Sequence, residues 1–252
     1  YTHILSARAY TYPSNSMDRT FTIKLRLEEP LYVEIRGKEC SNLVLDASET
    51  IQYLQLEGFN NIARFNFSNF PNLYTLIVRN WSEMQNIDVR SCVKLEKFVV
   101  SQTNISELDL SNNTDITFLD CAQNQLQSLN LSSTIDLEEL WAFDNNLTHL
   151  DLSANRKLRN LSCAKNALTS LNLSGLKYLN VMRLSNNLIE KIIIDEQPDL
   201  REMSVINNLL DKAEIENLFN ALPRTSDKYQ TVHIFNNPGT ELSDKSIAKN
   251  KG

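Results

Sequence analysis

One pattern of residues recurs every 21 residues through the middle of the chain, from Ile116 to Asn208. The copy that begins at Leu158 places apolar residues and one asparagine at fixed offsets: Leu158, Leu161, Cys163, Asn166, Leu168, Leu171 and Leu173. The copy before it begins at Leu137, and the copy after it at Leu179. A period of this length predicts a solenoid, in which one coil cannot bury its apolar side chains alone and does so by stacking on its neighbours.

Each coil holds two short alternating pieces, such as Leu119 to Cys121 and Leu129 to Leu131. Alternation is strand-like, so each coil is expected to contribute one strand to each of two parallel ladders. A coil of 21 residues leaves no room for a full helix between them. The ninth position is an asparagine that is expected to satisfy buried backbone groups at a bend. These asparagines are Asn124, Asn145, Asn166, Asn187, Asn208 and Asn237.

The pattern loosens toward the N-terminus. It begins at Leu43, and two copies of 22 residues follow. Upstream, Phe21 to Leu27 and Leu31 to Ile35 alternate on either side of Glu28-Glu29-Pro30, which predicts a β-hairpin that caps the first coil. Residues 1–20 show no period and are expected to form a leader. The predicted division is therefore residues 1–42 as leader and hairpin cap, and residues 43–252 as solenoid.

The C-terminal end departs from the period after Leu210. Asp211 to Glu214 has the spacing of a capping box, and apolar residues then follow helical spacing until Pro223. One helix is expected to replace the second strand here. Val232 to Asn237 matches the first half of one further coil. The capping segment is therefore expected from about residue 209, with the polar tail closing the end.

Charge and motifs exclude several classes of function. The net charge is −6 without a run of like charges, which argues against a nucleic-acid partner. No stretch approaches the roughly 18 apolar residues of a membrane span. The three histidines, His3, His149 and His233, have no metal-binding spacing, and the chain has only five glycines and no phosphate loop or nucleophile elbow. We therefore expect no enzyme, no metal and no cofactor.

The cysteines are predicted to be structural. Cys121 and Cys163 share one repeat position two coils apart, so with strands about 4.8 Å apart their separation would be roughly 10 Å, beyond disulfide reach. We interpret both as small buried apolar residues, and Cys40 and Cys92 as free thiols.

Residues between the inward apolar positions of the first ladder are expected to face outward. Most of them suit solvent, but aromatic and aliphatic side chains gather in the middle copies. The predicted ligand-binding set on this face comprises five apolar residues and a rim of carboxylates: Phe118, Trp141, Phe143, Ile77, Val99, Asp120, Glu139 and Asp144. Apolar clusters edged by charge are typical of binding sites, although strands favour aromatic and β-branched residues in any case.

The pattern Leu-x-x-Leu-x-Cys-x-x-Asn-x-Leu-x-x-Leu-x-Leu-Ser resembles the short, 21-residue class of bacterial leucine-rich repeats. The segment from Ala213 to Gly252, with Asn237-Pro238-Gly239, is similar to the C-terminal end of exported leucine-rich-repeat proteins of gut Bacteroidetes. The resemblance implies a right-handed, mostly β solenoid grouped with the α/β horseshoes. It also implies export to the periplasm or cell surface, often by a lipid anchor, and a role in binding or adhesion. Thr103, Trp81 and Phe59 depart from it at the asparagine position.

Three functions stay open at this point. The favoured one is an extracellular or cell-surface module that binds a protein or glycan on its concave face. The alternative is a passive spacer or interaction domain of a larger assembly. A carbohydrate-active enzyme would need two carboxylates at a fixed separation in one cleft, and no such pair can be selected from the sequence.

Overall fold

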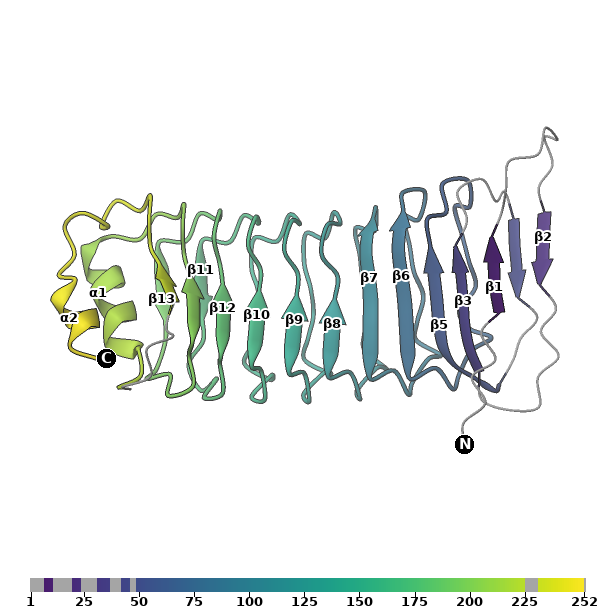
Figure 1. The fold of residues 1–252 in the computed structure, drawn as a ribbon, viewed down its shortest axis with the longest axis horizontal. Coiled ribbons are helices and arrows are strands. Elements are labelled where there is room, and N and C mark those ends of the chain that lie inside the picture. The colour runs from purple at the N-terminus through teal and green to yellow at the C-terminus, as the bar shows by residue number, and fades with distance from the viewer. Residues whose placement is uncertain are drawn as a thin grey trace. The chain divides into compact units, whose positions relative to one another are not determined.

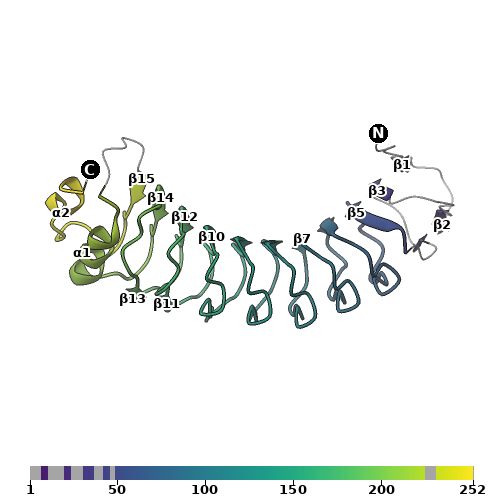
Figure 2. The same cartoon turned by 90° about the horizontal axis from the view of Figure 1, so that it is seen from below.

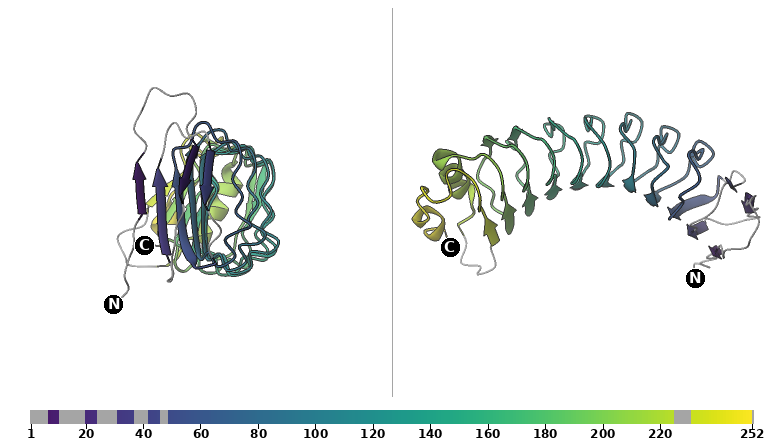
Figure 3. Two further views of the ribbon diagram at one scale, coloured as in Figure 1. Left: turned by 90° about the vertical axis from the view of Figure 1, so that its right-hand side faces the viewer. Right: turned by 90° about the horizontal axis from the view of Figure 1, so that it is seen from above.

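A computed structural model describes residues 7–10, 20–23, 31–36, 42–45, 49–224 and 231–251. The chain divides into two compact units, an N-terminal unit of residues 1–126 and a C-terminal unit of residues 127–252. In each unit the strands lie along one side of the stacked coils and the returning segments along the other (Figure 3). Both units are therefore built as the predicted solenoid of parallel strands.

The first ladder of the N-terminal unit contains six parallel strands in the order β1, β3, β5, β6, β7 and β8 (Figure 1). Their bounds are Ala7–Tyr10, Leu31–Arg36, Ile51–Glu57, Thr75–Trp81, Lys97–Thr103 and Phe118–Asp120. A separate pair, β2 (Thr20–Ile23) and β4 (Asn42–Leu45), is also parallel. Here the strands reach seven residues, whereas those of the C-terminal unit have three.

The first ladder of the C-terminal unit contains five parallel strands in the order β9, β10, β12, β14 and β15. Their bounds are Glu139–Trp141, Asn160–Ser162, Val181–Arg183, Glu202–Ser204 and Thr231–His233. The central residues are in register as Leu140, Leu161, Met182, Met203 and Val232. Because the first four of them are almost fully buried, they form the continuous inward stack that the period predicts.

The asparagines of the ninth position form a ladder of hydrogen bonds between coils. Asn187 Nδ2 donates to Cys163 O of the preceding coil (3.1 Å) and to Leu184 O of its own coil (2.9 Å). Its Oδ1 accepts the N–H of Leu168 (3.1 Å). Asn166 and Asn208 repeat these donations one coil away on each side. The predicted role of the asparagine, satisfying buried backbone groups at a bend, is confirmed.

Where the asparagine is missing, other side chains fill its place. Trp81 is fully buried against Phe59, with ring centroids 4.7 Å apart, and its indole N–H donates to Ile62 O. Thr103 donates its hydroxyl to Asn124 Oδ1. Trp81 and Thr103 therefore keep a buried hydrogen bond, through an indole and a hydroxyl, whereas Phe59 packs its ring against Trp81.

The residue before the ninth repeat position, which is an asparagine in most coils, has a left-handed backbone in every described coil from β6 onward. Its φ is 53° at Asn80, 56° at Gln123, 54° at Lys165 and 58° at Asn186. Left-handed backbone costs an ordinary L-residue about 1–2 kcal/mol, except that asparagine tolerates it better. This position was not singled out from the sequence.

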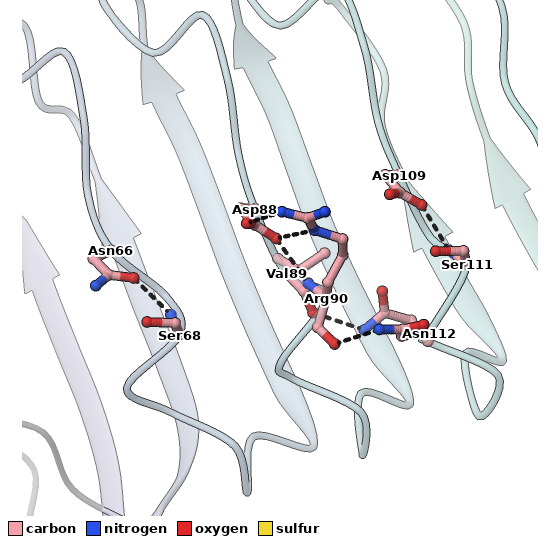
Figure 4. Close-up of polar contacts among 9 residues, drawn as sticks. Asn66, Ser68, Asp88, Val89, Arg90, Asp109, Ser111 and Asn112 are labelled. Carbon is pink, nitrogen blue, oxygen red and sulfur yellow. Dashed lines mark hydrogen bonds and ion pairs between the residues drawn. The ribbon is translucent and has the colours of Figure 1, made fainter.

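The second ladder is shorter than predicted. In the C-terminal unit it consists of β11 (Ser170–Asn172) paired with β13 (Lys191–Ile193). In other described coils, an Asp or Asn side chain accepts the N–H two residues later, as Asp109 does from Ser111 (3.0 Å) and Asp151 from Ser153 (2.9 Å). Figure 4 shows three such turns in the N-terminal unit. Because these side chains offer the backbone a local acceptor, turns replace most strands on this side.

The predicted N-terminal hairpin is wrong. β2 pairs with β4, and β3 pairs with β1 and β5, so the two expected hairpin strands lie in different sheets and run parallel to their partners. The reason is visible in the spacing, since Val33 and Ile35 precede Leu54 and Leu56 by 21 residues and are in register with them. The segment 24–30, which holds the expected turn, lies outside the described residues, as does most of the expected leader.

The C-terminal end contains the predicted helix, and a second, short helix that was not predicted. Helix α1 (Lys212–Ala221) begins after Asp211, whose carboxylate accepts the N–H of Glu214 (2.9 Å). It lies beside β13 (Figure 2). Glu214 accepts the N–H of Ile192 (3.2 Å), and Asn217 donates to Ile192 O (3.4 Å). Helix α2 (Ser246–Lys249) follows in the tail and packs on α1. The free edge of β13 is therefore satisfied by side chains of α1.

The described cysteines are structural, as predicted. Cys92, Cys121 and Cys163 are buried, and none of them forms a disulfide within the described residues. Burial raises the pKa of the Cys92 thiol to about 11 and that of Cys163 to about 12, so both stay protonated at neutral pH. Cys40 lies outside the described residues.

Candidate binding surface

The eight residues predicted to bind a ligand are divided between the two units. Ile77, Val99, Phe118 and Asp120 belong to the N-terminal unit, and Glu139, Trp141, Phe143 and Asp144 to the C-terminal unit. That these eight residues form one site stays a prediction.

In the C-terminal unit, Trp141 is the most exposed aromatic residue of the predicted set. Its side chain points outward from β9, and 37% of its surface is exposed, whereas its neighbour Leu140 is fully buried. Phe143 and Glu139 are half-buried at the two ends of the same segment. The strand therefore presents aromatic surface, as the alternation predicts.

A hollow of about 200 Å³ opens beside Trp141. It is lined by Trp141 from β9, Asn160, Leu161 and Ser162 from β10, and Val181 and Arg183 from β12. Trp141, Ser162 and Arg183 are in register on these three adjacent strands. One row across the ladder thus runs from an indole through a hydroxyl to a guanidinium.

Arg183 is held in place by an ion pair on the side of the next strand. Its Nε donates to Glu202 Oε1 (2.6 Å) and its Nη2 to Glu202 Oε2 (2.7 Å). This two-bond pairing lowers the pKa of Glu202 and raises that of Arg183, so both side chains are charged at neutral pH. The guanidinium is therefore a fixed positive charge at the wall of the hollow.

Beyond Arg183 the face becomes polar and then aromatic again. Ser185 and Ser204 share a hydrogen bond between their hydroxyls (2.7 Å). On β15 and just after it, His233 and Phe235 stack with ring centroids 6.4 Å apart, and Phe235 is exposed. Asp144, predicted to rim the aromatic cluster, is half-buried at the left-handed bend (φ 59°), with Lys165 Nζ 3.9 Å from its Oδ2.

In the N-terminal unit, the aliphatic part of the predicted surface is covered. Val99 is fully buried and Ile77 nearly so, although both occupy outward positions of β6 and β7. Arg79 on β6 reaches across β7 to Asp120 on β8, with Nη2 3.5 Å from Oδ2. Because Ile77 and Asp120 also flank Val99 in register, Val99 has no exposed surface to offer a ligand.

Asp120 is accordingly a buried carboxylate, and its expected place on an exposed rim is wrong. Only 5% of the residue is exposed. Desolvation raises its pKa, although the N–H of Ala122 and the Arg79 guanidinium both favour the charged form. Phe118, half-buried, lies under Lys97, whose Nζ is 4.8 Å from the ring centroid. A charged layer thus covers the apolar outward positions here.

Two features of this face were missed from the sequence. Tyr32 and Tyr53 stack in parallel with centroids 4.0 Å apart, and their hydroxyls donate to Glu34 and Gln55. The pairing of Arg183 with Glu202 was also missed, although both residues occupy outward offsets of the repeat. The offsets could have placed all of these side chains on one face, but not paired them across coils.

The described residues contain neither a group of three or more His, Cys, Asp or Glu side chains that could hold a metal ion nor a helix that is long and apolar enough to cross a membrane.

No family model matches the chain, and no curated protein matches it in sequence. Solved structures of bacterial leucine-rich-repeat proteins do match. The functional domain of InlJ from Listeria monocytogenes has a TM-score of 0.67 and 21% identity, over 90% of this chain and 51% of that one. The internalin inlF of the same species has a TM-score of 0.61 and 16% identity, over 88% and 78%. A leucine-rich-repeat protein of Leptospira interrogans has a TM-score of 0.60 and 18% identity, over 90% and 70%.

This chain spans about half the length of the InlJ structure. At these identities the likeness establishes the fold alone. The chain therefore has the leucine-rich-repeat fold, as the repeat pattern predicts.

Proposed function

We propose that this leucine-rich-repeat chain is a protein-binding module that binds its partner on the outward face of the first ladder, with Trp141 at the centre of the contact in the C-terminal unit. The observation that carries the proposal is the exposed indole beside a hollow of about 200 Å³, on strands whose inward residues are fully buried. Partly exposed aromatic residues next to a hollow dominate the binding energy of many interfaces.

The setting of this module is also a proposal. The resemblance to exported leucine-rich-repeat proteins supports a periplasmic or cell-surface location, with a lipid anchor upstream of the chain. Fractionation of cells that express the full-length protein, with metabolic labelling by a fatty-acid analogue, tests both. Recovery of the unlabelled protein with cytosolic markers would reject them.

A selection from a displayed library of random twelve-residue peptides tests the binding proposal. Selection on the native chain should enrich peptides that bind it. These peptides should bind the Trp141→Ala variant at least tenfold more weakly, a loss of about 1.4 kcal/mol or more in binding free energy. Tyr178→Ala is the matched control, because Tyr178 is an exposed aromatic residue outside the first ladder, with Arg159 over its ring. If enriched peptides bind the Trp141→Ala variant as tightly as the native chain, Trp141 is not the contact. If no peptide is enriched, the spacer function is favoured.

A further inference from the structure

The hollow beside Trp141 has one charged side chain in its wall, and it is a cation. Arg183 lines the hollow together with Asn160 and Ser162, which can donate hydrogen bonds, and with the apolar groups of Trp141, Leu161 and Val181. No carboxylate belongs to the lining. The wall is therefore rich in hydrogen-bond donors and contains a guanidinium but no carboxylate, which complements an acidic group.

The ion pair with Glu202 orients this cation without occupying all of it. A guanidinium has five N–H donors, and the two bonds to Glu202 use one on Nε and one on Nη2. Glu202 lies on β14, on the side of β12 away from β10 and Trp141. A second carboxylate can therefore bind the remaining donors from the side of the hollow. The existing pair fixes the guanidinium before the ligand arrives, which reduces the entropy lost on binding.

The distance between Trp141 and Arg183 along this row indicates how far apart the two interacting side chains of the ligand must be. Trp141, Ser162 and Arg183 lie on adjacent strands in register, so the Cα atoms of neighbouring members are about 4.8 Å apart and those of Trp141 and Arg183 roughly 10 Å apart. In an extended segment, residues two apart point the same way and are separated by about 6.6 Å. Flexible side chains can bridge the difference.

We propose that the hollow between Trp141 and Arg183 binds an extended, acidic protein segment, in which an apolar side chain packs on Trp141 and an aspartate or glutamate two residues away binds Arg183. This assignment rests on the proposed function and narrows its partner class. Acidic segments are preferred over neutral ones because the carboxylate meets a preoriented guanidinium, and basic segments are rejected by the same charge.

The test is a charge exchange that keeps the structural ion pair. The double variant Arg183→Glu with Glu202→Arg retains a pair between β12 and β14 but places the negative charge at the hollow. Peptides selected on the native chain should be enriched in aspartate and glutamate two residues from an apolar residue. Changing that acidic residue to its amide should weaken binding to the native chain at least tenfold, as expected for loss of a charge-assisted pair. The double variant should show no acidic enrichment while retaining the thermal unfolding midpoint of the native chain.

The outcomes separate this inference from the function on which it rests. Enriched peptides that need Trp141 but show no acidic preference overturn the inference and leave the proposed function standing. Loss of all binding in Trp141→Ala, with acidic enrichment retained by the double variant, assigns the acidic preference to another cation and also overturns it. Alginate, a polysaccharide of uronic acids, serves as the second probe. If alginate binds in a manner that depends on Arg183 and no peptide is enriched, the ligand of the hollow is an acidic glycan and the proposal of a protein segment is overturned. If the double variant unfolds, Arg183→Gln in the native background supplies the same comparison.

Discussion

The bend asparagines allow one stability prediction to be worked out in detail. Replacing Asn187 with alanine removes a side chain that is 6% exposed and makes hydrogen bonds to three backbone groups. Two of those groups keep a partner, because Cys163 O also accepts from Asn166 and Leu184 O also accepts from Asn208. The third, the Leu168 N–H, is left without one, since its only acceptor is Asn187 Oδ1 among the described contacts.

The magnitude follows from that single unsatisfied donor. A buried N–H without an acceptor costs about 1–3 kcal/mol, and the lost packing of the carboxamide adds to it, so Asn187→Ala should lower the free energy of unfolding by about 2–3 kcal/mol. The matched control is Asn172→Ala, because Asn172 is exposed and its two donors, the N–H and hydroxyl of Ser174, can turn to water. The control should cost about 0.5 kcal/mol.

Two measurements check the result. Urea unfolding followed by circular dichroism gives the change in free energy, compared at equal slope so that a change in cooperativity is recognised. Amide hydrogen exchange gives a local measure, in which the Leu168 N–H should lose protection in Asn187→Ala and keep it in Asn172→Ala. Equal destabilisation by the two variants, or an unchanged Leu168 amide, would refute the account of the ladder.

Two further predictions concern the backbone and the buried carboxylate. At the left-handed position Gln123 (φ 56°), glycine should raise the free energy of unfolding by about 0.5 kcal/mol and valine should lower it by about 1–2 kcal/mol, measured by urea unfolding. A glycine variant less stable than the native chain would contradict this. The pKa of Asp120 is raised in the folded chain, so its contribution to stability is fully present below the ordinary aspartate pKa of about 3.9 and is lost as pH rises through the raised value. Relative to Asp120→Asn, the native chain should therefore lose stability as pH rises from 4 toward neutrality, and thermal unfolding midpoints that shift equally with pH in both proteins would exclude this.

The periodic parts of the fold were predictable because one constraint acts on every coil. Leu140, Leu161 and Met182 occupy the same offset and must stack, and Asn166 and Asn187 must satisfy the same bend. The start of α1 was predictable because its cap is local, involving Asp211 and Glu214 alone. The prediction of an N-terminal hairpin was wrong because alternation of apolar residues indicates a strand but not the strand with which it pairs.

The predicted exposure of the outward face in the N-terminal unit was wrong for a related physical reason. Strand alternation places Val99 outward, but its exposure depends on whether Arg79 on one strand can reach Asp120 two strands away. That reach depends on rotamers and on long side chains, and no offset in the repeat encodes it. The same holds for Arg183 and Glu202, which the sequence puts on one face without showing that they pair. Trp141 is partly exposed on this face, as predicted.

The shared acceptors of the bend have a consequence for how such chains change length. Asn166, Asn187 and Asn208 each bond to a carbonyl of their own coil and to the equivalent carbonyl one coil earlier. An in-frame deletion or duplication of one 21-residue block in this stretch would present every surviving amide with an identical pair of oxygens. Recombination can therefore add or remove whole coils while every asparagine keeps its hydrogen bonds. A loss or gain of any other number of residues would interrupt the ladder of asparagine hydrogen bonds.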